Sequence, residues 1–130
     1  MMLIDTGPIV ALFDASDNYH NHCVETLKKI DETFETAWAV LTESFYLLGF
    51  SWKAQDNLWE FILRDGIEII PLDEKLRTRC RALMKQYRDL PMDLADATLV
   101  SVTESHKIAD IFTLDRIFHY KKNENIDISA

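Results

Sequence analysis

The chain has little glycine, proline or cysteine, the residues that most often loosen or cross-link a fold. Glycine and proline occur three times each among 130 residues, which leaves no flexible linker or low-complexity segment to divide the chain. No internal repeat is visible. The length suits a single buried core, so we expect one domain over residues 1–130.

Long apolar runs are also missing. The longest, SFYLLGFSW at 44–52, is far too short to cross a bilayer. The amino-terminal stretch MMLIDTGPIVALF has no basic leader, so we expect it to form a first strand rather than a secretion signal. We therefore expect a cytoplasmic protein, in which Cys23 and Cys80 are free thiols.

Basic residues are fewer than acidic residues in this chain. There are 14 Lys and Arg against 22 Asp and Glu, and the formal net charge is −8. This balance argues against a protein that grips nucleic acid by bulk electrostatics. A nuclease is not excluded, because carboxylates around a metal ion add negative charge and substrate contacts need only a local basic face.

Short apolar runs alternate with helical periodicities along the chain. Strands joined by helices imply a mainly parallel sheet that is covered on both faces. The expected fold class is therefore α/β, a three-layer α/β/α sandwich. We predict strands at 2–4, 36–41, 67–72, within 109–115 and within 125–129, and helices at 9–13, 20–31, from 42, 55–64, 74–88 and from 93.

Carboxylates follow three of the predicted strands: Asp5, Glu43 and Asp115. Sites in parallel sheets form at the carboxyl ends of the strands. Each acid also has a plainer interpretation, as a helix cap, a first-turn residue or a turn residue. Three such acids in one chain favour a single site in which their side chains lie together. Burying acids is costly unless they are paired or bind a metal, so such a site suggests a bound metal ion.

The segment LPMDLADATLVSV contains two further acids, Asp93 and Asp96. Taken alone, the pair favours helix capping, with Asp93 at the N-cap and an acid three residues later reaching back. The three strand-end acids change this interpretation for Asp96. We expect Asp93 to cap the helix and Asp96 to join the other acids.

The donor set Asp5, Glu43, Asp96 and Asp115 consists of oxygen ligands, which favours Mg²⁺ or Mn²⁺ over Zn²⁺. Such an acid cage is the usual machinery for hydrolysing a phosphodiester. We predict Asp5 and Asp96 as direct metal ligands, and Asp115 as a ligand directly or through water. Glu43 would position the attacking water or complete a second metal site.

Four segments resemble, in order, the signature blocks of PIN domains, and most closely the bacterial VapC-type toxins. The segments are LIDTGPIVALF, TE at 42–43, DLADATLVSVTE and IFTLDRIFHY, and they run from residue 3 to 120. The resemblance implies a three-layer α/β/α fold and Mg²⁺- or Mn²⁺-dependent ribonuclease activity. It also implies a homodimer and, for a toxin, an antitoxin partner.

Carried over by position, the family's acidic quartet is Asp5, Glu43, Asp96 and Asp115, and Asp93 is an additional acid. The resemblance places Thr6 and Thr113 at small hydroxyl positions that orient a carboxylate or a water. The leading interpretation is an endoribonuclease toxin. The alternative is a non-catalytic regulatory module that binds metal or a partner, and cleavage of DNA instead of RNA stays open.

The predicted helix 74–88 carries a row of cations, Arg77, Arg81, Lys85 and Arg88. The row suits contact with an RNA backbone or an acidic partner, but we favour a solvated face opposite a buried one. The buried face would comprise Leu76, Cys80, Leu83 and Tyr87.

Two other groups of residues are weaker signals. His20, His22 and Cys23 lack a second ligand pair, so we expect an ordinary helix start there. The three tryptophans, Trp38, Trp52 and Trp59, suit the core or a partner interface better than base stacking. The apolar stretch around them fits burial against a second copy or an antitoxin helix.

Overall fold

The computed structural model describes residues 1–90, 92–108, 110–114 and 127–129, with only the backbone of the last three. Five strands form one parallel sheet in the order β3-β2-β1-β4-β5, so β1 lies at the centre between β2 and β4. The strands are β1 (Met2–Ile4), β2 (Phe34–Thr36), β3 (Ile67–Ile69), β4 (Asp110–Thr113) and β5 (Asp127–Ser129).

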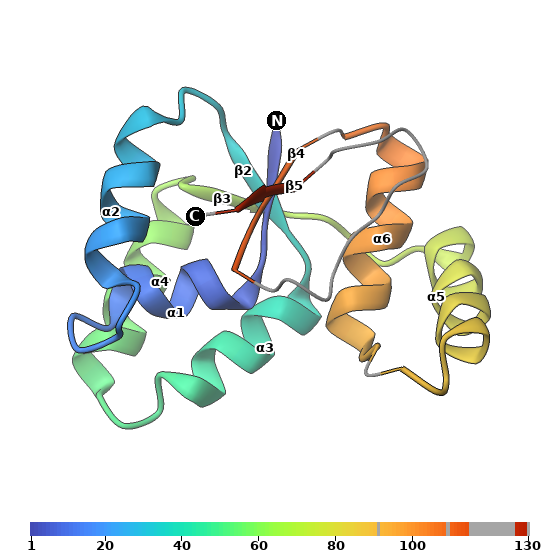
Figure 1. The fold of residues 1–130 in the computed structure, drawn as a ribbon, viewed down its shortest axis with the longest axis horizontal. Helices are drawn as coiled ribbons and strands as arrows, with labels where there is room; N and C mark the ends of the chain where they lie inside the picture. The colour runs from blue at the N-terminus through green and yellow to red at the C-terminus, as the bar shows by residue number, and fades with distance from the viewer. Residues whose placement is uncertain (91, 109, 115–126, 130) are drawn as a thin grey trace.

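Helices cover both faces of the sheet, which confirms the predicted α/β class with three layers. Figure 1 shows α1, α2 and α4 on one side, α5 and α6 on the other, and α3 across the lower end. The helices are α1 (Thr6–Phe13), α2 (His20–Lys29), α3 (Trp38–Leu47), α4 (Trp52–Leu63), α5 (Glu74–Gln86) and α6 (Leu94–His106).

The core lies where the central strands meet the two helical layers. Leu3, Ile4 and Phe112 have no exposed side-chain surface, as expected for strands that are covered on both faces. Among the described residues, no helix is both long and apolar enough to cross a membrane.

One predicted strand is wrong. The apolar run at 36–41 was expected to be a strand that ended before Glu43, but β2 ends at Thr36 and α3 begins at Trp38. Val40, Leu41 and Ser44 are buried at helical spacing. A short apolar run fits a buried strand and a buried helix equally well, and here the helical spacing extends far enough to decide. The strand predicted at 67–72 is shorter in the structure, where β3 is Ile67–Ile69. The helix predicted from residue 55 begins earlier, at Trp52.

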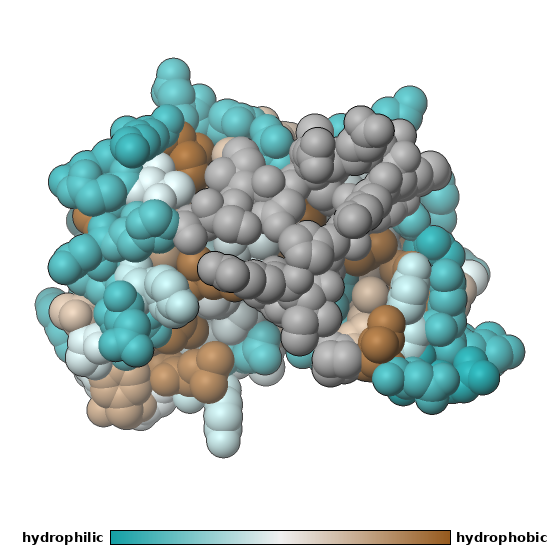
Figure 2. All heavy atoms as spheres, viewed as in Figure 1, coloured by the Kyte–Doolittle hydropathy of each residue, from teal (hydrophilic) through white to brown (hydrophobic). Residues whose placement is uncertain are grey.

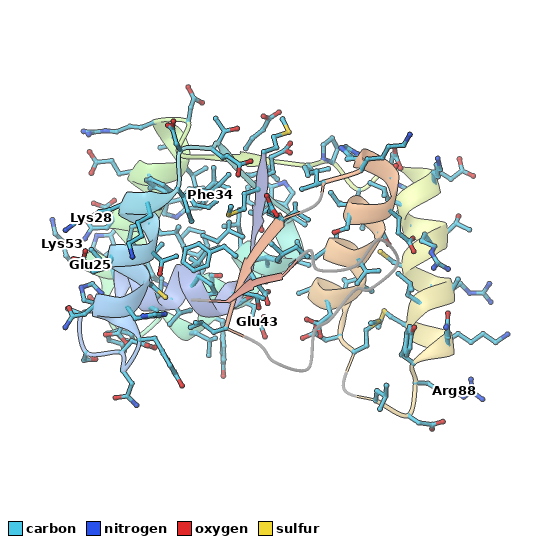
Figure 3. The ribbon with its side chains drawn as sticks, turned by 45° about the horizontal axis from the view of Figure 1, so that its top comes forward. Glu25, Lys28, Phe34, Glu43, Lys53 and Arg88 are labelled. Carbon is cyan, nitrogen blue, oxygen red and sulfur yellow. The ribbon has the colours of Figure 1, made fainter. Side chains whose placement is uncertain are left out.

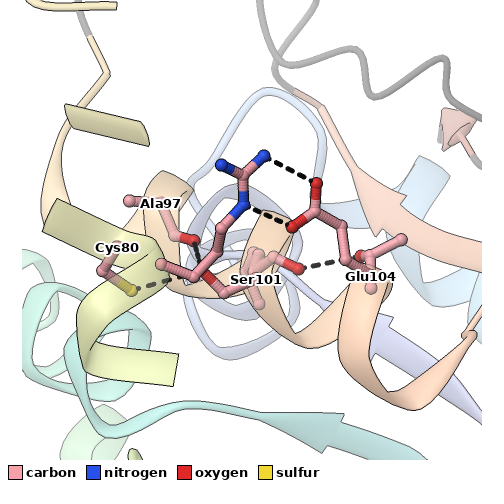
Figure 4. Close-up of polar contacts among 7 residues, drawn as sticks. Cys80, Ala97, Ser101 and Glu104 are labelled. Atoms are coloured by element: carbon pink, nitrogen blue, oxygen red, sulfur yellow. Dashed lines mark hydrogen bonds and ion pairs between the residues drawn. The ribbon is translucent and has the colours of Figure 1, made fainter. Parts of the chain in front are cut away.

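Helices α5 and α6 pack against each other on one side of the sheet. The guanidinium of Arg79 donates two hydrogen bonds to the Glu104 carboxylate, from Nε at 2.7 Å and from Nη2 at 3.0 Å (Figure 4). Below this pair, the buried thiol of Cys80 lies 3.4 Å from Ser101 Oγ. The predicted buried face of α5 is confirmed at Leu76, Cys80 and Leu83.

Candidate active site

Three helices begin close together at the carboxyl edge of the sheet. In Figure 1, the starts of α1 and α3 lie together just below the end of β1, and the start of α6 lies to their right. Helix α3 packs against both α1 and α6. Residues in the first turns of these helices are therefore brought together, although they are far apart in the sequence.

Asp5 lies at the centre of this edge and is 5% exposed. It is the N-cap of α1, and its Oδ1 accepts a hydrogen bond from the Thr6 backbone N–H at 2.8 Å. Its Oδ2 accepts one from Thr113 Oγ1, at the end of β4, at 3.0 Å. Its backbone N–H donates to Phe112 O at 3.0 Å. The carboxylate is thus fixed between the ends of two neighbouring strands.

Glu43 reaches the same edge from helix α3. Thr6 Oγ1 donates to Glu43 Oε1 at 2.7 Å, so a single threonine contacts both Asp5 and Glu43. Figure 3 shows Glu43 in the middle of the molecule, near the ends of the strands. Its predicted position at a strand end is wrong, because the residue lies in the second turn of α3. The hydroxyls of Thr6 and Thr113 do contact the acids, as the resemblance implied.

Asp93 and Asp96 form a capping box at the start of α6. Asp93 Oδ1 accepts from the Asp96 backbone N–H at 2.8 Å, and Asp96 Oδ2 accepts from the Asp93 backbone N–H at 3.3 Å. The capping interpretation therefore holds for both residues. Each of these two hydrogen bonds uses one oxygen of a carboxylate. Because a carboxylate has about four acceptor positions, it can accept other bonds as well. Capping and a role in the site are compatible for Asp96.

The fourth predicted acid, Asp115, lies outside the described residues. Within the described part of the chain, no three His, Cys, Asp or Glu side chains are grouped closely enough to hold a metal ion. The donor chemistry that is described consists of carboxylate and hydroxyl oxygens, which suits a hard divalent cation. A complete ligand set at this edge would need Asp115.

Comparison with protein families identifies the family of the chain. The family model for the PIN domain matches residues 2–123. The protein belongs to the PIN domain family. This is a family of nucleases. A search of curated proteins finds no significant match for this PIN domain.

Solved structures share the fold of this PIN domain at low sequence identity. VapC20 of Mycobacterium tuberculosis, a toxin that cleaves the sarcin–ricin loop, is 18% identical with a TM-score of 0.78, over 91% of this chain and 92% of that one. A toxin–antitoxin complex from Klebsiella pneumoniae is 15% identical with a TM-score of 0.72, over 98% and 96%. VapBC2 of Rickettsia felis, bound to a promoter DNA fragment, is 20% identical with a TM-score of 0.64, over 98% and 97%.

Other features of this PIN domain lie away from the acidic edge. A groove of about 750 Å³ between α5 and α6 is lined by residues of those helices, including Arg79 and Glu104, and the described acids Asp5, Glu43 and Asp96 do not line it. His20 is the first residue of α2, and its Nδ1 lies 2.7 Å from Ala11 O. Burial raises the pKa of the neighbouring Cys23 thiol to about 11. An ordinary helix start is confirmed at these residues.

One buried acid of this PIN domain has no counterpart among the sequence predictions. Glu35 is 4% exposed, and its Oε1 has no hydrogen-bond partner within the described residues. The wrong bounds of the second strand placed Glu35 outside the predicted sheet. A strand pattern centred on FET, with Phe34 and Thr36 as its neighbours, would have found it.

Proposed function

We propose that this protein is a metal-dependent endoribonuclease that acts in the cytoplasm as the toxin of a toxin–antitoxin pair, built as a single domain over residues 1–130. One observation carries the proposal. The hydrogen-bonded group of Asp5, Thr6, Glu43 and Thr113 joins three elements at the carboxyl edge of the sheet. In a chain of the PIN domain family, this is the edge where a phosphodiester would be cleaved.

Each described residue of the site would have its own role. Asp5 is held rigidly, because the Thr6 backbone N–H and the Thr113 hydroxyl fix its two oxygens separately. Glu43 is half-buried and accepts from Thr6, so one oxygen is oriented and the carboxylate can hold a water in line with the scissile phosphorus. Asp96, on the first turn of α6, approaches from the opposite side of the edge.

The residues fit a divalent cation. Asp5 and Asp96 would hold it, Asp115 would complete the set, and the donors are all oxygens. When bound, Mg²⁺ or Mn²⁺ would lower the pKa of a water and neutralise charge on the attacked phosphate.

RNA cleavage with and without metal tests the proposal. We expect cleavage of a structured RNA with Mn²⁺ or Mg²⁺ and none with EDTA. Asp96→Asn should abolish cleavage while the protein stays folded, because an amide oxygen replaces a charged ligand. Asp56→Asn, at an exposed acid on α4, is the matched control and should cleave normally.

Two results would contradict this assignment. Full activity of folded Asp96→Asn would remove Asp96 from the site. Cleavage absent with every metal, in folded protein, would favour the alternative of a regulatory module that uses the acidic edge to bind metal or a partner. Parallel digestion of single-stranded DNA would decide between the two polymers.

An exposed apolar surface supports the proposed antitoxin partner and homodimer. The side chains of Tyr46, Phe50, Trp52 and Leu63, on α3, α4 and their connection, are 66% to 82% exposed. Figure 2 shows apolar residues gathered over this region at the lower left. Large exposed apolar side chains that gather on one face mark protein interfaces. The three tryptophans are therefore better explained as interface residues than as core, since each is at least 38% exposed.

A further inference from the structure

We infer that the cationic row on α5 and the turn that follows it, formed by Arg77, Arg81, Lys85 and Arg88, binds the phosphate backbone of the RNA and leads the strand to the acidic edge. This inference rests on the proposed ribonuclease function and names the surface that holds its substrate. We call these four residues the α5 row.

Charge is strongly segregated in this chain. Six of its 14 Lys and Arg lie between residues 74 and 88, where Glu74 is the one acid, although the whole chain has a net charge of −8. This segment therefore carries a clear net positive charge within an acidic chain. A polyanion approaching an acidic protein is attracted at such a positive segment.

The α5 row is exposed and separate from the buried face of its helix. Arg77, Arg81 and Lys85 follow one another at four-residue intervals, so they share one side of α5. Leu76, Cys80 and Leu83 occupy another side and are buried. Figure 2 shows hydrophilic side chains along the outer side of α5, at the right.

Within the described residues, no member of the α5 row takes part in an ion pair. By contrast, the neighbouring Arg79 is bound to Glu104. The row does have backbone contacts, since Arg77 Nη1 donates to Leu72 O at 2.7 Å and Arg88 Nη1 to Lys85 O at 2.8 Å. Each guanidinium has five N–H donors, so these bonds orient the groups and leave donors for phosphate oxygens.

The spacing of the row suits an extended strand. Arg77 and Lys85 lie eight residues apart, which is about 12 Å along a helix, so the cations are presented as a line rather than a cluster. A line of cations follows the backbone of a single strand without reading its bases. An acidic peptide would also be attracted, but a continuous phosphate backbone matches an unbroken row better.

The row ends a few residues before the start of α6. Arg88 stands five residues before Asp93, the N-cap of α6, so their Cα atoms are at most about 18 Å apart. Figure 3 shows Arg88 just past the lower end of α5 and Glu43, on α3, in the middle of the molecule. A strand that lies along α5 therefore leads to the first turn of α6 and to Asp96.

Two triple variants with the same loss of charge test the inference. The row variant is Arg81→Gln/Lys85→Gln/Arg88→Gln. The control variant is Lys28→Gln/Lys29→Gln/Lys53→Gln, which changes exposed lysines of α2 and α4 on the other side of the sheet (Figure 3). Binding of a short fluorescein-labelled single-stranded RNA is measured by anisotropy in EDTA, over a series of NaCl concentrations, with circular dichroism to confirm folding.

We expect the row variant to raise the Kd about tenfold or more at low salt, and the control variant to change it far less. The slope of log affinity against log salt should decrease in magnitude by about 2 in the row variant, since three single-strand phosphate contacts are lost. With metal present, KM for cleavage should rise while kcat is unchanged.

Equal weakening by both variants, or an unchanged salt slope in the row variant, would overturn the inference. So would unchanged RNA binding together with lost binding of a poly-glutamate peptide, which would assign the row to an acidic protein. Failure of the nuclease proposal looks different. If no metal supports cleavage but RNA binding still depends on the row, the inference stands and the proposed activity falls.

Discussion

Glu35 shows what a single buried carboxylate does to the fold. It lies on β2, where its register neighbours are Leu3 on β1 and Glu68 on β3. Burial is the main cause that raises the pKa of Glu35, and the Glu68 charge raises it further. The charges of His106 and the amino terminus partly offset this rise in pKa. The ionised form of Glu35 is therefore less stable in the folded protein than in the unfolded chain.

The sign of the pH effect follows. Because the folded-state pKa of Glu35 lies above its unfolded value, its contribution to stability is fully present below the unfolded pKa. That contribution is lost as pH rises through the folded pKa. Glu35→Gln does not titrate, so it should be more stable than the wild type at neutral pH, by about 1 kcal/mol.

Thermal or urea unfolding as a function of pH measures this difference. The advantage of Glu35→Gln should be small near pH ~4, where Glu is ordinarily half-protonated, and should grow toward neutral pH. Glu25→Gln, at an exposed acid on α2, is the control and should show no such growth. An advantage that is the same at every pH would contradict the assignment to Glu35 ionisation.

The start of helix α6 combines a structural and a proposed functional role. The capping box satisfies backbone N–H groups that no helical carbonyl can reach. Asp93 makes the shorter bond, at 2.8 Å, and Asp96 the longer, at 3.3 Å. Asp93 is thus the stronger cap, and the capping hydrogen bond of Asp96 is the weaker of the two.

Substitution of Asp93 should accordingly affect stability more than activity. Asp93→Ala should lower the free energy of unfolding by about 1 kcal/mol, whereas Asp93→Ser keeps a capping oxygen and should be close to the wild type. Asp73→Ala, at the equivalent N-cap of α5, should cost a similar amount. Asp93→Ser that is fully stable yet inactive on RNA would show that Asp93 belongs to the site.

At the scale of the whole molecule, the proposed function depends on acids from separate elements sharing one cation. Binding to the folded state alone stabilises it by mass action, by about 2.7 kcal/mol at one hundred times Kd. We therefore expect saturating Mn²⁺ to raise the Tm by about 10 °C for a domain of this size. Differential scanning fluorimetry with and without Mn²⁺ measures this rise without any substrate.

The same measurement on variants locates the ion. Asp96→Asn should lose most of the Mn²⁺-dependent rise in Tm, while Asp56→Asn should keep it. A Tm that is identical with Mn²⁺ and with EDTA would argue against a cation at this edge. A rise that Asp96→Asn preserves in full would place the ion elsewhere.

The amino-acid sequence by itself determined the order of strands and helices along the chain, the cap at Asp93, and the buried face of α5. These features depend on residues within a few positions of one another. Local spacing and capping chemistry are sufficient to specify them. The resemblance to PIN domains likewise followed from short contiguous blocks, and the family match confirms it.

Only the tertiary structure decided how the site is assembled. Thr113 reaches Asp5 across 108 residues, and Glu43 arrives through α3 instead of a strand end. Both contacts depend on β1 lying beside β4 and on α3 packing against α1. The local pattern at 36–41 suited strand and helix alike, and packing selected the helix. The burial of Glu35 has the same origin, since sheet order and helix packing decide which charges lose contact with water.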